Sequence, residues 1–113
     1  MVNKKNKDKE NKNDDGINFK ERVYSILRKI PKGKVITYKR LAQLAGNNKA
    51  ARVIGNLMRI NKNPEKIPCY KVVKSNGAIG GYSAKGGIKK KIQLLKKDGI
   101  QIKNGKIEKK FMY

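Results

Sequence analysis

Histidine and tryptophan are absent from this 113-residue chain, and cysteine occurs once, as Cys69. Without histidine, the serine and cysteine nucleophiles that depend on an imidazole base cannot be assembled. One cysteine and no imidazole also leave too few ligands for a common zinc site, and no GxxxxGKS/T phosphate-binding loop is present. The sequence therefore predicts no metal or cofactor and leaves a nucleophilic cysteine as the main candidate chemistry.

Long apolar runs are missing as well. None approaches the roughly 20 residues that span a bilayer, and the N-terminus does not resemble a signal peptide. A single cysteine also has no partner for an internal disulfide. These features predict a cytoplasmic, intracellular protein without a membrane role, in which Cys69 is a free thiol.

Acidic residues are scarce, with 8 against 30 lysines and arginines, so the net charge is +22. Removing residues 1–16, with their five lysines and four acids, leaves 25 basic and 4 acidic residues and a net +21. A folded part this basic is typical of proteins that bind nucleic acid, because lysine and arginine release the counterions of phosphates. A lysine-rich genome bias is the alternative interpretation of the same counts.

Residues 1–16 consist of lysine, asparagine and acidic residues with almost nothing to bury, so we expect a disordered tail. Apolar side chains then recur at helical spacing, and Pro31 with Gly33 ends this first predicted helix. After a short extended segment, Thr37 can cap a second helix that Gly46 ends. The apolar positions of the first helix are Phe19, Val23, Ile26, Leu27 and Ile30.

A third predicted helix follows the turn at Gly46 and Asn47 and has one apolar and one basic face. Two short helices joined by a tight glycine-containing turn are the pattern of a helix-turn-helix, in which the second helix contacts DNA. The apolar stripe is Ala50, Val53, Ile54, Leu57 and Met58, and the expected DNA-binding side chains are Lys49, Arg52, Asn56 and Arg59.

The second half of the chain predicts a mixture of elements. Residues 61–69 form a loop, Asn76 and Gly77 indicate a hairpin turn between two apolar stretches, and a last helix covers 87–97. The C-terminal residues add a strand or fray. Residues 17–113 are therefore expected to form one small α+β domain.

Cys69 follows Pro68 in the loop after the basic helix, where positive charge would stabilise a thiolate and raise its reactivity. The alternative is a small buried hydrophobic residue with no reaction to perform. The sequence around this cysteine decides between the two interpretations.

Four motifs in order resemble the C-terminal domain of the O6-alkylguanine-DNA alkyltransferases, over nearly the whole length from Phe19 to Gly99. They are IPKGKVITYKRLAQLAG at 30–46, AARVIGNLMRIN at 50–61, IPCYKVV at 67–73 and GAIGGYS at 77–83. The resemblance implies a winged-helix-type domain with a helix-turn-helix. It also implies DNA repair by irreversible, single-turnover transfer of an alkyl group from guanine O6 to the cysteine of the Pro-Cys motif.

The resemblance places the nucleophile at Cys69 and gives roles to its neighbours. Arg52 would take the place of the flipped base in the duplex, and Asn61 would brace the active-site loop. Tyr38 would hydrogen-bond the flipped guanine, whose edge the backbone of Val72 and the hydroxyl of Ser83 would read. As alternatives, Tyr38 is an ordinary tyrosine at a helix start, and Asn61 an ordinary turn residue.

Three positions depart from the family, which usually has Pro-Cys-His-Arg and a glutamate before a glycine. Here Tyr70 takes the place of the histidine, Lys71 that of the arginine and Asp98 that of the glutamate. Either Tyr70 passes the thiol proton along a water chain towards Asp98, or the basic surroundings already hold Cys69 as thiolate. Lys71 is expected to contact DNA.

The expected partner is double-stranded DNA that contains O6-alkylguanine, bound by a monomer. Two alternatives belong to other functional classes. The first is a non-catalytic relative that binds the lesion, although such relatives replace the acceptor cysteine. The second is a plain helix-turn-helix protein, which would leave the IPCYKVV motif unexplained.

Overall fold

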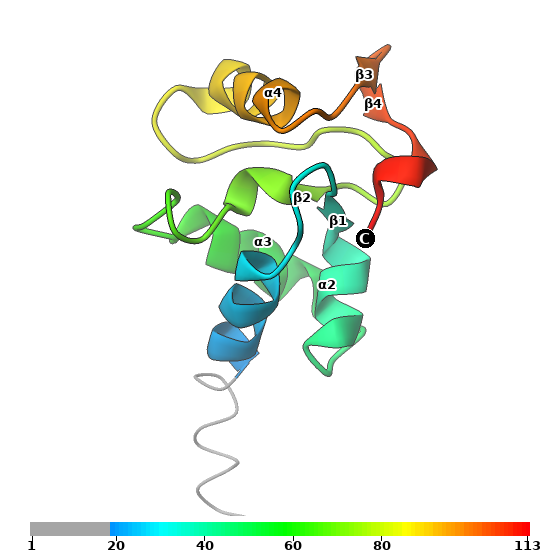
Figure 1. Cartoon of the computed structure of the whole chain (residues 1–113). Coiled ribbons are helices and arrows are strands. Elements are labelled where there is room, and N and C mark those ends of the chain that lie inside the picture. The colour runs from blue at the N-terminus through cyan, green and yellow to red at the C-terminus, as the bar shows by residue number, and fades with distance from the viewer. Residues whose placement is uncertain (1–18) are drawn as a thin grey trace, which may run out of the picture.

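The structure, a computed structural model, describes residues 19–113, so the predicted disordered tail at 1–16 lies outside the described residues. Its first element is the predicted amphipathic helix, observed over 19–28 (Figure 1). Two long-range hydrogen bonds anchor this helix. Arg22 donates to the Ala45 carbonyl at 2.7 Å, and the Tyr24 hydroxyl donates to the Leu57 carbonyl at 2.8 Å.

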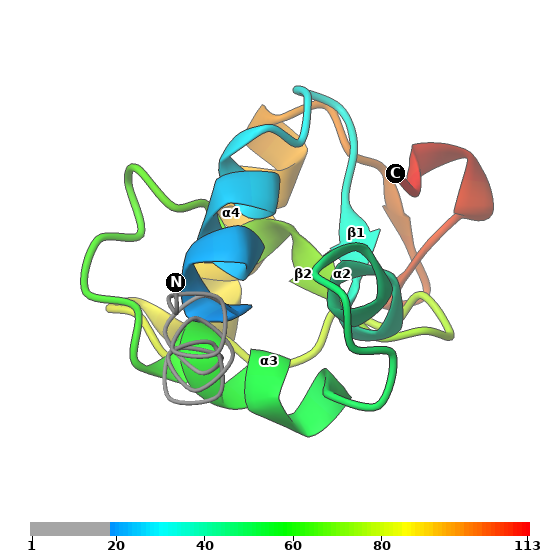
Figure 2. The same ribbon diagram turned by 90° about the horizontal axis from the view of Figure 1, so that it is seen from below.

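The predicted pair of helices is present as α2 (Tyr38–Leu44) and α3 (Ala51–Arg59), which pack against each other. The Thr37 hydroxyl accepts from the Arg40 N–H at 3.0 Å and so caps α2. Gly46 then has a φ of +101°, a conformation that glycine adopts at little cost. Seen from below, α3 lies beside α2 and the N-terminal helix (Figure 2).

Two details of the third helix were predicted wrongly. Val53 was placed in the apolar stripe, yet 47% of it is exposed, because the buried side of α3 is the narrower arc of Ile54, Leu57 and Met58. Lys49 was placed on the helix but precedes it, because the side chain of Asn47 accepts from the Lys49 N–H at 3.1 Å and holds a turn.

A short parallel pair, β1 (Ile36–Thr37) and β2 (Val72–Val73), crosses the middle of the molecule (Figure 1). Successive side chains of a strand point to opposite faces. Ile36 and Val72 accordingly belong to one buried cluster, together with the N-terminal helix, α2 and α3. Val35 and Val73 belong to a second cluster on the opposite side.

The predicted hairpin at Asn76 and Gly77 is only a turn. The Gly77 N–H donates to the Lys74 carbonyl at 2.9 Å, but β2 pairs with β1, and Ala78 pairs with Lys106 instead. The strand before the turn thus forms its ladder with a strand distant in sequence, which local turn chemistry cannot indicate. Across the turn itself, the Lys74 N–H donates to the Ala78 carbonyl at 2.9 Å.

The second cluster is covered by α4 (Gly87–Lys97), which matches its predicted bounds, and by the C-terminal residues. These residues form the hairpin of β3 (Ile102–Lys103) and β4 (Lys106–Ile107), followed by the 3-10 turn η2 (Lys109–Phe111). Asn104 and Gly105 both have positive φ, as a two-residue hairpin turn requires. The result is the predicted small α+β domain, and none of the described helices is long and apolar enough to cross a membrane.

We predict that the C-terminal hairpin is part of the folded core. Ile107 is 4% exposed, so Ile107→Ala should lower the free energy of unfolding by about 2–4 kcal/mol. Ile88→Ala is the matched control, because Ile88 is 53% exposed and should change stability by less than about 0.5 kcal/mol. Urea denaturation measures both variants, and equal stabilities would show that the hairpin does not close the second cluster.

Candidate active site

Cys69 is the first residue of the 3-10 turn η1 (Cys69–Lys71), which lies directly before β2. It is 6% exposed and belongs to the first buried cluster, whereas the adjacent Tyr70 packs against the second. The nucleophile candidate and its neighbour in sequence therefore face opposite sides of the short sheet.

Asn61 hydrogen-bonds within the loop that leads to Cys69, where the family resemblance places a brace. Its side-chain amide donates to the Ile67 carbonyl at 2.9 Å, and its side-chain oxygen accepts from the Asn63 N–H at 2.9 Å. Because Ile67 lies two residues before the thiol, one side chain fixes both ends of the loop.

Burial raises the pKa of the Cys69 thiol above its ordinary value. A hydrogen bond from Asn61, the Cys69 backbone and the positive charge of Lys91 lower the pKa, but their effect is smaller than that of burial. This direction is opposite to the prediction that basic surroundings hold a preformed thiolate. Most of the lysines are exposed at the surface, where water and salt screen their charges.

Lys71 was predicted to contact DNA, and this prediction is wrong. Lys71 is only 4% exposed, and its ammonium group lies 3.1 Å from the Asp98 carboxylate. The same ammonium donates to the carbonyls of Ile30 and Pro31, at 3.3 and 2.9 Å. A buried cation with these partners joins the turn at Cys69 to the end of the N-terminal helix and is not available to a phosphate.

Tyr70 does not replace a general base in this arrangement. Burial, followed by the negative charges of Asp98 and Tyr82, raises the pKa of Tyr70 to about 12. The Asp98 carboxylate accepts from the Gly33 N–H at 3.1 Å and pairs with Lys71, and no hydrogen bond joins it to Tyr70 among the described residues.

Lys91 is a site residue that the sequence analysis missed. It is 1% exposed, and its ammonium donates to the carbonyls of Val72 and Gly81, at 2.7 and 3.2 Å. One signal was available: in the predicted last helix, Lys91 lies three residues after Ile88 and four before Leu95, a spacing that places it on the same face as these apolar residues. A charge on the core face of a helix is unusual enough to indicate a role.

The side chain of Tyr38, at the start of α2, lies close to the Lys91 ammonium. It packs against the cluster that contains Cys69, and burial, with a smaller contribution from Cys69, raises its pKa. A Cβ atom on Gly80 would lie 3.7 Å from the Tyr38 hydroxyl and 3.8 Å from the Lys91 ammonium. The backbone of Gly80 and Gly81 therefore lies close to both Tyr38 and Lys91. The predicted substrate contact Ser83, two residues after Gly81, is exposed.

A hollow of about 450 Å³ opens between the loop before Cys69, the loop before α4 and α4 itself. Tyr70 and Tyr82 form part of its lining, and the pKa of Tyr82 is raised by burial and by the charge of Cys69. Within residues 19–113, no group of three or more cysteine, aspartate or glutamate side chains could hold a metal ion. The remaining residues that line the hollow are Pro64, Glu65, Ala84, Lys85, Lys90 and Leu94.

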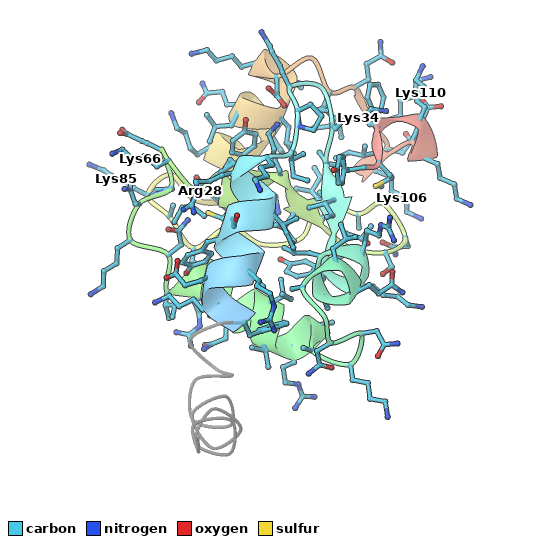
Figure 3. All side chains as sticks on the ribbon, turned by 60° about the horizontal axis from the view of Figure 1, so that its bottom comes forward. Arg28, Lys34, Lys66, Lys85, Lys106 and Lys110 are labelled. Atoms are coloured by element: carbon cyan, nitrogen blue, oxygen red, sulfur yellow. The ribbon has the colours of Figure 1, made fainter. Side chains whose placement is uncertain are left out.

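The candidate DNA-binding side chains of α3 are exposed. Arg52, Asn56 and Arg59 lie on α3, Lys49 lies just before it, and Arg59 donates a hydrogen bond to Asn56. Positive charge is not confined to this helix. Figure 3 shows Arg28, Lys66 and Lys85 on one side of the molecule and Lys34, Lys106 and Lys110 on the other.

Residues 18–100 match the family model described as "6-O-methylguanine DNA methyltransferase, DNA binding domain". The chain belongs to this family. It is 50% identical over 88 residues to a bifunctional methyltransferase/endonuclease of Picrophilus torridus, covering 78% of this chain and 29% of that protein. It is 46% identical over 80 residues to the methylated-DNA--protein-cysteine methyltransferase of Homo sapiens, covering 71% of this chain and 38% of the relative.

Two solved structures have similar folds. S. pombe Atl1, crystallised with damaged DNA containing O6-carboxymethylguanine, has a TM-score of 0.76 and 27% identity, with 84% of this chain and 94% of Atl1 covered. Mycobacterium tuberculosis OGT in complex with DNA has a TM-score of 0.67 and 33% identity, with 72% and 48% covered. The chain spans about a quarter to two-fifths of the length of the curated methyltransferases it matches.

Within this 6-O-methylguanine DNA methyltransferase domain, the buried thiol has a measurable consequence. Reaction of Cys69 with iodoacetamide should continue to accelerate above pH about 8.5, the ordinary pKa of a cysteine. The reason is that burial raises the pKa, so the folded protein holds less thiolate at neutral pH than the unfolded chain. Rates measured against pH for the folded protein, and for the same protein in urea as control, give the two midpoints. A folded midpoint at or below the unfolded one would contradict the raised pKa, and one below about pH 7 would show a preformed thiolate.

Proposed function

We propose that this domain repairs DNA by transferring an alkyl group irreversibly from guanine O6 to Cys69, once per protein molecule. The observation that carries the proposal is the surroundings of the thiol. Cys69 is buried beside Tyr38, in a loop braced by Asn61 and followed by Val72, within a fold whose solved relatives include complexes with DNA. A cysteine that only fills space in a hydrophobic cluster would need neither the braced loop nor the nearby tyrosine.

The reaction balances with groups that the chain or solvent supplies. The Cys69 thiol loses its proton to water, and the sulfur attacks the alkyl carbon in line with the bond to O6. The S–C bond forms as the C–O6 bond breaks, and the electron pair of that bond goes to the guanine. The Tyr38 hydroxyl hydrogen-bonds the base, which takes a proton from water and remains in the DNA as neutral guanine. The thioether is stable, so the protein is consumed.

The same proposal includes the binding of double-stranded DNA by a monomer of winged-helix type, through α3. Arg52 fills the place of the flipped guanine, and Lys49, Asn56 and Arg59 contact the backbone. Base flipping costs a few kcal/mol and is easiest for a damaged base, which supplies part of the selectivity. The Ser83 hydroxyl and the Val72 carbonyl read the guanine edge, the carbonyl through the lone pair that Lys91 does not use.

Cys69→Ser is expected to abolish methyl transfer, because a serine hydroxyl is far harder to ionise than a thiol. Transfer is measured from a duplex that carries one radiolabelled O6-methylguanine. Fluorescence anisotropy with the same duplex is the control, and binding should remain within about threefold of wild type, since the substitution leaves the charge of the DNA-binding surface unchanged. Undiminished transfer by the variant would contradict the proposal.

Arg52→Ala is expected to slow repair of duplex DNA by at least about tenfold more than repair of single-stranded DNA, in which no base stack must be refilled. Arg59→Ala is the matched control on the same helix, because a backbone contact affects both substrates alike. Single-turnover rates on the two substrates measure the difference. An equal loss for Arg52→Ala on both would leave it only a phosphate contact.

Lesion binding without transfer is the second candidate function. The observation that favours it is the similarity to S. pombe Atl1, which was crystallised with DNA containing O6-carboxymethylguanine and of which 94% is covered. The sulfur at Cys69 favours transfer instead. Tight binding of O6-methylguanine DNA with no methyl group on the protein would establish this second function.

A further inference from the structure

The domain buries two ammonium groups, and they are stabilised in different ways. Lys71 pairs with the Asp98 carboxylate, so its positive charge is neutralised by an acid. Lys91 donates to two backbone carbonyls, those of Val72 and Gly81. Two carbonyl dipoles satisfy part of the hydrogen-bonding capacity of an ammonium but do not cancel its charge. Lys91 therefore brings a net positive charge into the interior.

The carbonyls that hold Lys91 belong to two segments of the proposed site. Val72 lies three residues after Cys69, and Gly81 lies in the segment that leads to Tyr82 and Ser83. A Cβ atom on Gly80 would be in van der Waals contact with both the Lys91 ammonium and the Tyr38 hydroxyl, so the Gly80 backbone lies close to these two groups. The ammonium therefore connects the segment that carries the nucleophile with the segment that faces the substrate.

We propose that Lys91 is a positioning residue of the transfer reaction, which holds residues 78–86 against the Cys69 segment and stabilises the Cys69 thiolate with its charge. This inference rests on the proposed function for its biological use. Lys91 does not remove the thiol proton, which goes to water. Its positive charge lowers the free energy of forming the thiolate in a buried position.

The charge needed for this role is present at neutral pH. Burial lowers the pKa of Lys91 to about 8, while the negative charge of Cys69 acts in the opposite direction. At pH 7 the ammonium form therefore exceeds the neutral amine by roughly ten to one. The influence is reciprocal, because the charge of Lys91 lowers the pKa of Cys69.

Other titratable groups around the site do not supply the same charge. The tyrosines that feel the charge of Cys69 have raised pKa values, so they are neutral at pH 7. Lys74 contributes its side-chain carbons near Gly80, but the residue is exposed, so its charge is screened. The charge of Lys71 is neutralised by the Asp98 carboxylate. The tyrosines whose pKa values respond to Cys69 are Tyr24, Tyr38 and Tyr82.

Lys91→Met tests the proposal, because methionine keeps the length of the side chain and removes the charge. At pH 7, where Lys91 is charged in the wild type, alkylation of Cys69 by iodoacetamide should be about tenfold slower in the variant, the size of a one-unit rise in the pKa of the thiol. Lys91→Arg retains a positive charge and should stay closer to wild type. Lys89→Met, on the exposed side of α4, is the matched control and should not slow the reaction. Equal rates for wild type and a folded Lys91→Met would overturn the proposal.

A second measurement does not depend on replacing a buried lysine. Carbon-13 NMR of the Lys91 side chain in the wild-type protein shows whether its amine is charged at pH 7. We expect the ammonium form there, because burial lowers the pKa of Lys91 only to about 8, and a neutral amine at pH 7 would overturn the proposal. Methyl transfer from DNA is assayed separately. Its absence in the wild type would reject the proposed function, whereas the iodoacetamide and NMR results decide the role of Lys91.

Discussion

Burial of the Cys69 thiol is the constraint on which the rest of the site depends. A cysteine must become a thiolate to attack carbon, and the protein places it where charge is unfavourable, at 6% exposure within a hydrophobic cluster. Such a place excludes water and protects the thiol from adventitious oxidation, but it also raises the pKa. Polar contacts close to the sulfur therefore have to offset part of the free energy needed to ionise the buried thiol.

The two buried lysines divide this task. Lys71, paired with Asp98 and bonded to the end of the N-terminal helix, fixes the position of the turn that begins with Cys69. Lys91 fixes the next segment through Val72 and, in our proposal, adds the charge that the sulfur needs. The total charge of +22 has little effect on the thiol, because charge at the surface is screened and one buried charge is not.

Local sequence signals predicted the elements that are determined locally. Thr37 caps α2, and the bounds of α4 were predicted exactly as found, because caps, glycine stops and helical spacing act within a few residues. The loop brace at Asn61 came from the family resemblance and is present in the structure. What was missed depends on partners distant in sequence. β2 pairs with β1 rather than with the residues after Gly77, and Lys71 meets Asp98, 27 positions away in the chain.

The ionisation of Cys69 could not be predicted from composition, because it depends on which charges are buried rather than on how many exist. The central claim of alkyl transfer is tested most directly by mass spectrometry of the protein after incubation with excess duplex containing O6-methylguanine. We expect one methyl group per molecule, located by peptide mapping on Cys69, and no further turnover however much DNA is supplied. A protein that binds the damaged duplex yet stays unmodified would contradict the account.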